Sequence, residues 1–183
     1  MGSNKDTNMQ LVNIIKNLSN LDGDLLAHYG LSRQFEITIV GSGALIMLGL
    51  LDTARRTTDI DVLESPPEIV QFFDSYQMNT LVETFLYAYP QTWRERKQRL
   101  AFSGDCLTVY TMSLEDLVIL KLLAFRKRDQ EDLEDITKPG KLDWNQLEAL
   151  IADPTELRIN LESEETWLAF FERYKWLLAK RVT

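Results

Sequence analysis

Two aspartates that stand two positions apart, Asp59 and Asp61, are the side chains of this sequence best suited to chemistry. They open a short run, 59–64, whose composition predicts a strand. Residues two apart in a strand point to the same face, so both carboxylates would aim at one point. Such oxygen ligands suit Mg²⁺ or Mn²⁺. The same pattern also fits carboxylates that face solvent, or that pair with Arg55 and Arg56.

A glycine-rich turn, Gly41-Ser42-Gly43, precedes the aspartates and follows the apolar β-branched run 37–40. Glycines let the backbone approach a phosphate closely, and the first N–H groups of a following helix are donors, as is the Ser42 hydroxyl. No Gly-Lys-Ser/Thr follows, so this is not a Walker A loop. The third glycine of a dinucleotide fingerprint is misplaced. The turn therefore indicates a phosphate site, although tight packing alone also produces such turns.

A later segment gathers charges on one helical face. Ser113 and Asp116 form a capping-box pattern that predicts one long helix from 113 to about 136. At about 100° per residue, four charged positions fall within a sector of about 60°. They are Lys121, Arg128, Asp132 and Asp135. Either they form salt bridges along the helix, such as Arg128 with Asp132, or Lys121 and Arg128 contact a triphosphate.

The remaining periodicities describe the elements that position these residues. Helices are predicted at 8–30, 43–50, 68–79, 144–151 and 163–180, and strands at 36–40 and 59–64. The segments 99–103 and 107–111 predict a hairpin around Gly104-Asp105. We therefore expect an α/β (α+β) fold, a small mixed β-sheet flanked by helices. The core spans 1–112, and a C-terminal helical section, 113–183, packs on it.

Composition limits the classes of function. The net charge of −8 argues against broad, nonspecific binding of nucleic acid, although basic clusters occur at 94–99 and 126–128. No run of 18 apolar residues predicts a membrane span, and the N-terminus has no apolar signal core. Cys106 is the single cysteine, and His28 is the single histidine, which disfavours a Ser-His-Asp hydrolase. We expect a cytoplasmic protein.

The glycine turn, the aspartate pair and the later charged segment, in this order along the chain, resemble the nucleotidyltransferase superfamily with the DNA polymerase β-like fold. There a Gly-Gly or Gly-Ser turn holds the triphosphate, and an Asp-x-Asp pair on the next strand binds divalent metal. The lead-in 55–58, Arg-Arg-Thr-Thr, and the later 120–129 segment with Lys121 and Arg128-Asp129 are similar to the AbiEii-type toxins and related small nucleotidyltransferase-like proteins. The resemblance covers roughly residues 36–136.

The resemblance implies a set of roles and partners. Asp59, Asp61 and Lys121 would be catalytic, with Mg²⁺ or Mn²⁺ on the two aspartates. The nucleotide would contact Gly41, Ser42, Gly43, Arg55, Thr57 and Arg128. The donor would be a nucleoside triphosphate, and the acceptor an RNA, a protein or a small molecule. By analogy with the toxins alone, an antitoxin would be the protein partner.

The sequence departs from this superfamily at the third metal carboxylate. On the predicted strand 107–111, Thr108 stands where an acid would be expected. The alternatives are Asp105, Glu115, Asp129 and Asp132. Two rival hypotheses follow: a catalytically degenerate domain that binds nucleotide or protein, or an interaction module whose C-terminal helices, 141–183, form a docking surface. A third carboxylate within reach of Asp59 and Asp61 would favour the enzyme.

Overall fold

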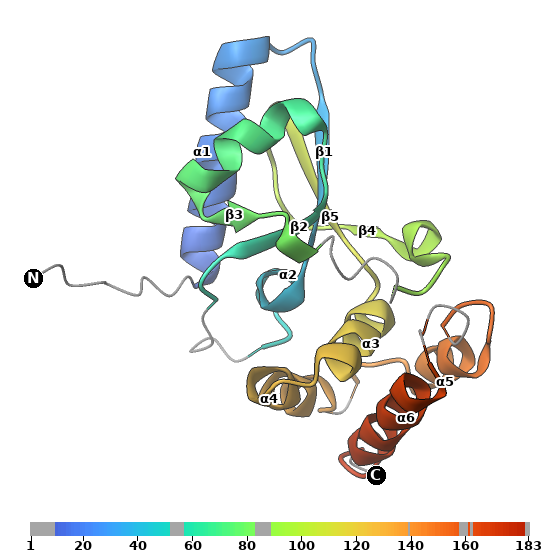
Figure 1. Cartoon of the computed structure of the whole chain (residues 1–183). Helices are drawn as coiled ribbons and strands as arrows, with labels where there is room; N and C mark the ends of the chain where they lie inside the picture. Colours follow the sequence, from blue (N-terminus) through green and yellow to red (C-terminus); the bar gives the residue numbers. More distant parts are fainter. Residues whose placement is uncertain are drawn as a thin grey trace, which may run out of the picture. The chain divides into compact units, whose positions relative to one another are not determined.

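The computed structural model describes residues 10–51, 57–82, 89–138, 140–157, 161 and 163–181, and it has a mixed α+β fold (Figure 1). The first elements are α1 (Leu11–Tyr29), β1 (Phe35–Val40), α2 (Gly41–Met47), β2 (Ile60–Glu64), the 3₁₀ helix η1 (Pro67–Tyr76) and β3 (Met78–Asn79). They are followed by the 3₁₀ helix η3 (Trp93–Arg96), β4 (Gln98–Arg99), β5 (Leu107–Thr111), α3 (Leu114–Ala124), α4 (Lys127–Ile136), α5 (Trp144–Ala152) and α6 (Glu164–Leu178). No helix within the described ranges is both long and apolar enough to cross a bilayer.

The chain divides into two compact units. The first draws on residues 1–82 and 99–111, and it contains α1, α2, η1 and most of the sheet. The second draws on 83–98 and 112–183, and it contains η3 and helices α3 to α6. The chain thus leaves the first unit after Val82 and returns to it at Arg99 to form the strand β5.

The five strands form one mixed sheet in the order β3-β2-β1-β5-β4, as the predicted fold class requires. The central strand β1 runs antiparallel to β2 and parallel to β5, and β2 runs parallel to β3. Val40 pairs with Asp61, and Asp61 pairs with Asn79. The register therefore sets these three residues in one row, at the carboxyl end of β1.

Local signals explain the first helix. Buried apolar residues recur at spacings of three and four along α1, at Ile14, Leu18, Leu21 and Leu25. This amphipathic stripe is what a surface helix packs against a core. Gly30 ends the helix with a φ of +78°, and its N–H donates to the Leu26 carbonyl at 2.9 Å. In the first unit α1 contacts both η1 and α2 (Figure 1).

Two predicted helices are wrong in detail. The helix expected at 68–79 is the 3₁₀ helix η1, which ends at Tyr76 and is followed by Gln77 with a φ of +54°. Met78 and Asn79 instead form the strand β3. The single helix expected at 113–136 is broken at Phe125, whose φ is +48° and whose N–H donates to the Lys121 carbonyl at 2.8 Å. The predicted cap at Ser113 is confirmed, since the Asp116 N–H donates to its Oγ at 3.2 Å.

Asp22 joins α1 to the start of β5. Its Oδ2 accepts the N–H of Asp105 at 2.8 Å, and its Oδ1 accepts those of Cys106 and Leu107 at 2.9 and 2.8 Å. A Cβ on Gly104 would lie 2.7 Å from Oδ1, so the turn must be glycine at that position. Burial works to raise the Asp22 pKa, but the backbone hydrogen bonds outweigh it and lower the pKa below the ordinary 3.8.

The same contact makes Cys106 an inert thiol. The Cys106 side chain is buried, and its Sγ donates to Asp22 Oδ1 at 3.4 Å. Burial, followed by the hydrogen bond to Asp22, raises the pKa of Cys106 to about 11. A thiol with so high a pKa is protonated at neutral pH, whereas the thiolate is the nucleophile. Cys106 is therefore part of the packing at the start of β5.

Asp22→Ala should lower the free energy of unfolding by about 2–4 kcal/mol, because three N–H groups lose a charged acceptor. The matched control is Asp74→Ala, which removes an exposed carboxylate from η1 and should change stability by less than about 0.5 kcal/mol. Urea denaturation at pH 7 measures both. Equal effects in the two variants would contradict this account of Asp22.

The Asp22 contribution should also depend on pH. Because its folded-state pKa is lowered, the stabilisation is present above the unfolded-state pKa and is lost as the pH falls through the folded-state pKa. Asp22→Asn, which cannot titrate, should flatten the decline of stability in the acid range below about pH 4. Urea titrations at a series of pH values measure this slope, and an unchanged slope in Asp22→Asn would refute the assignment.

Candidate functional site

Asp59 and Asp61 converge on the side-chain amide of Asn79. Its Nδ2 donates to Asp59 Oδ2 at 2.7 Å and to Asp61 Oδ1 at 3.0 Å. Asp59 immediately precedes β2, while Asp61 pairs with Asn79 across the β2–β3 ladder. All three residues are half-buried. A single NH₂ group thus bridges two carboxylates of like charge.

The orientation of this amide is fixed from its other side. The backbone N–H of Leu81 donates to Asn79 Oδ1 at 3.2 Å. A reversed amide would set its NH₂ group against that N–H, leaving two donors face to face. The nitrogen of Asn79 therefore points to the carboxylates. Asn79 was missed in the sequence because the local pattern assigned it to the end of a helix.

The glycine turn lies against the same carboxylates. Gly41 has a φ of +68°, and a Cβ added to it would lie 2.5 Å from Asp61 Oδ2. Asp61 thus presents one oxygen to Asn79 and the other to the Gly41 backbone. A Cβ on Gly43 would meet only the Asp59 carbonyl oxygen, at 3.9 Å, and the Ile60 Cα, at 4.0 Å. The structure brings the turn and the aspartate pair together, with Ser42 half-buried at the start of α2.

The two threonines before the aspartate pair, Thr57 and Thr58, both hydrogen-bond to Asp59. Thr57 is buried, and its Oγ1 donates to the Asp59 carbonyl at 2.9 Å. Thr58 Oγ1 donates to Asp59 Oδ1 at 3.1 Å. The Thr57 hydroxyl, a predicted nucleotide contact, is therefore bonded to the backbone here. Arg55, the other predicted contact in this segment, lies outside the described residues.

No group of three or more His, Cys, Asp or Glu side chains among the described residues is placed to hold a metal ion. Asp105 precedes β5, whose first residue, Leu107, pairs with Phe35 at the start of β1. Asp61 pairs with Val40, at the end of β1. Asp105 and Asp61 therefore lie toward opposite ends of the sheet, and Asp105 does not complete the site.

The donor set at this end of the sheet still fits a hard cation. Mg²⁺ is usually bound through one or two carboxylates, with water and substrate phosphates as the other ligands. Asp59 and Asp61 provide the two carboxylates, and the carboxamide of Asn79 adjoins both. The described part of the chain can thus hold a divalent cation that a triphosphate helps to coordinate.

The other predicted site residues belong to the second unit. Lys121 Nζ lies 2.7 Å from Asp132 Oδ2 and 3.2 Å from Asp129 Oδ1, and the three residues are only 5, 1 and 3% exposed. The break at Phe125 lets α4 fold back so that its acids reach Lys121. Lys121 and Arg128 were grouped because one continuous helix would place them on the same face. They lie instead on two separate helices, α3 and α4. Arg128 is exposed on α4.

Charge in this cluster is balanced by basic partners. Burial raises the pKa of Asp129, but the hydrogen bond from Arg126 Nε at 2.8 Å and the charge of Lys121 outweigh it and lower the pKa. The remaining candidate acid, Glu115, accepts the Asp143 N–H at 3.2 Å. In this structure Lys121 joins α3 to α4, and its predicted catalytic role remains a prediction.

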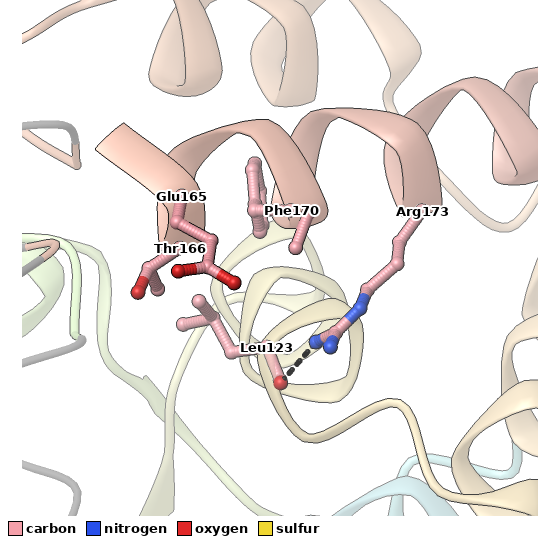
Figure 2. Close-up of a pocket in the computed structure, with 6 residues that line it drawn as sticks. Leu123, Glu165, Thr166, Phe170 and Arg173 are labelled. Carbon is pink, nitrogen blue, oxygen red and sulfur yellow. Dashed lines mark hydrogen bonds between the residues drawn. The ribbon is translucent and has the colours of Figure 1, made fainter. Parts of the chain in front are cut away.

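The second unit also contains a pocket of about 250 Å³ beside α3 and α6, which Figure 2 shows. Arg173 extends from α6, and its Nη1 donates to the Leu123 carbonyl at 2.5 Å (Figure 2). The same Nη1 donates to the Leu122 carbonyl at 3.0 Å. A cation at these last carbonyls stabilises the end of α3. Arg173 therefore caps the end of α3. None of the predicted site residues lines this pocket.

Lys121→Ala should lower the free energy of unfolding by about 3–5 kcal/mol, because it leaves two buried acids without their lysine. Lys127→Ala is the matched control, since Lys127 is exposed at the start of α4 and should matter by less than about 0.5 kcal/mol. Chemical denaturation measures both variants. A fully stable Lys121→Ala protein would show that the buried cluster is not structural.

Gly41→Ala should cost about 1–2 kcal/mol of stability, since a side chain disfavours the positive φ and the new methyl group displaces the Asp61 carboxylate. Gly43→Ala should be neutral or slightly stabilising, because its Cβ finds ordinary contacts within α2 and alanine favours helix. Thermal and urea denaturation compare the two. A larger loss in Gly43→Ala would contradict the geometry of the turn.

Comparison with known proteins gives one result. The family model described as "Nucleotidyltransferase of unknown function (DUF6036)" matches residues 13–181. This match takes in the glycine turn, both aspartates, Asn79 and the Lys121 cluster. Searches of curated proteins and of solved structures gave no match.

Proposed function

Because the chain belongs to this family of nucleotidyltransferases of unknown function, we propose that it moves a nucleotidyl group from a nucleoside triphosphate to an acceptor hydroxyl, using Mg²⁺ or Mn²⁺. The observation that carries the proposal is the convergence of Asp59 and Asp61 on one atom, beside the backbone of Gly41. This arrangement meets the two needs of the reaction, oxygen ligands for a cation and a backbone that a phosphate can approach.

The chemistry follows from these residues. Asp59 and Asp61 would hold the cation, which supplies charge neutralisation to the triphosphate when bound. The Gly41-Ser42-Gly43 backbone and the Ser42 hydroxyl would bind its phosphates. The acceptor oxygen bonds to the α-phosphorus as the bond to pyrophosphate breaks, and the hydroxyl proton passes to a base, for which Asp59 and Asp61 are the candidates. Positioning and electrostatics, rather than a covalent intermediate, would provide the catalysis.

The test is transfer of label from each of the four α-labelled NTPs, with Mg²⁺ or Mn²⁺, to cellular RNA or protein. Asp59→Asn and Asp61→Asn should each reduce transfer by about 100-fold or more, since each removes a charged metal ligand. Asp74→Asn changes an exposed carboxylate away from the site and serves as the control. No transfer with any NTP, together with no binding of metal–NTP at millimolar concentration, would refute the proposal.

A second candidate is a degenerate domain that binds nucleotide without transferring it. It is favoured by one observation, that the described residues provide no third carboxylate at Asp59 and Asp61. Both candidates predict binding of metal–NTP that depends on Asp59. They differ in pyrophosphate release, which only the transferase produces. Calorimetric binding combined with a pyrophosphate assay therefore separates them.

The narrower resemblance to AbiEii-type toxins supports the hypothesis of a cytoplasmic toxin with an RNA acceptor and an antitoxin partner. The net charge of −8 means that an RNA would be bound through a local basic patch. Within the predicted cluster 94–99, Arg96 is already held by Asp116 at 2.7 Å and Glu156 at 3.4 Å. The identity of the labelled acceptor in the transfer assay tests this hypothesis directly.

A further inference from the structure

The side chain of Asn79 adjoins both carboxylates of the proposed metal site. Its Nδ2 is 2.7 Å from an Asp59 oxygen and 3.0 Å from an Asp61 oxygen. Adjacent ligands of an octahedral Mg²⁺ ion, each about 2.1 Å from the metal, lie about 3 Å apart. Both spacings, which are those of the two hydrogen bonds, are also close to the edge of such a coordination shell.

Register, rather than an adaptable loop, sets this position. Asn79 pairs with Asp61 across the β2–β3 ladder, and the Ile60 N–H donates to the Gln77 carbonyl at 2.8 Å just before it. The Leu81 N–H holds the amide oxygen from the other side. Backbone pairing at and before position 79, together with the Leu81 N–H on its amide oxygen, thus directs this side chain at both aspartates.

We propose that position 79 is the third vertex of the metal site, and that asparagine there keeps the affinity for a free divalent cation low, so that the cation enters together with the triphosphate. This inference rests on the proposed function for the identity of the site. The side chains of Asp59, Asp61 and Asn79 carry two negative charges, where three carboxylates would carry three. Ligand charge is what tunes cation affinity in oxygen-ligand sites.

The amide also competes with the cation. While Nδ2 donates to both carboxylates, a cation can reach the same oxygens only by displacing those hydrogen bonds. Turning Oδ1 toward the cation would release the Leu81 N–H from its acceptor. Either rearrangement weakens binding of the free ion. The oxygens of a triphosphate, which arrive as additional ligands, offset that loss.

A purely structural role for Asn79 makes a different prediction. In that case it would only hold the backbone at Leu81, and an aspartate at position 79 could still accept the Leu81 N–H. Asn79→Asp would then introduce repulsion from Asp59 and Asp61 without any gain in metal binding. The response of this variant to a metal ion therefore separates a structural asparagine from a third vertex of the site.

The experiment measures binding of Mn²⁺ alone, from the electron paramagnetic resonance signal of the free ion, to the full chain without nucleotide. Asn79→Asp should bind Mn²⁺ at least about tenfold more tightly than the wild type. It should be less stable than the wild type in chelator and should gain more in melting temperature on addition of Mn²⁺. Asn145→Asp makes the same substitution at an exposed position in the second unit and should bind like the wild type.

The outcomes decide the inference separately from the proposed function. Mn²⁺ affinity in Asn79→Asp no higher than in the wild type, or an equal gain in Asn145→Asp, overturns the inference. So does an Asn79→Asp protein that remains unfolded in Mn²⁺, whereas folding induced by Mn²⁺ supports it. If Asn79→Asp binds Mn²⁺ tightly but the wild type transfers no nucleotidyl group, only the proposed function is refuted. Transfer that depends on Asp59, without tighter binding in Asn79→Asp, refutes only this inference.

Discussion

The candidate site depends on one constraint, the register that sets Val40, Asp61 and Asn79 in a row across β1, β2 and β3. Because side chains alternate along a strand, a slip of one residue in β2 would turn Asp61 to the opposite face. The positive φ of Gly41 lets the chain leave β1 immediately beside Asp61. Convergence of the carboxylates is thus a property of backbone pairing.

At the other end of the sheet, a contact from α1 holds the start of β5, the strand that pairs with β1. Asp22 binds three consecutive N–H groups at the start of β5, and β5 pairs in parallel with β1 from Phe35 to Ile39. A parallel pair has no tight turn to set its register, so a contact from α1 is an effective substitute. The carboxylate at Asp22 is structural and fully engaged, and it lies far along β1 from the aspartates of the site.

Local sequence signals predicted the parts of the fold that depend on neighbours in the chain. Gly30 and Ser113 mark helix ends through hydrogen bonds that span three or four residues, and the strand–glycine–helix order placed Gly41 beside Asp61. Asn79 and Asp22 were missed because their partners lie 18–20 and 83–85 residues away. Phe125 was missed because the left-handed region is typical of glycine and asparagine, not of an aromatic residue.

Two acidic clusters in the described part of the chain differ in burial and in the side chains that contact their carboxylates. Asp129 and Asp132 are buried against a lysine, which is the balance that a desolvated pair of acids requires to persist in a core. Asp59 and Asp61 are half-buried, and the amide of Asn79 donates to both carboxylates. A divalent cation gains little at the first cluster, where it would have to replace Lys121. At the second it meets carboxylates that remain accessible to water and to a phosphate. The buried ion pairs of Lys121 therefore give it a structural contact, and the half-buried carboxylates of Asp59 and Asp61 support the proposed cation site.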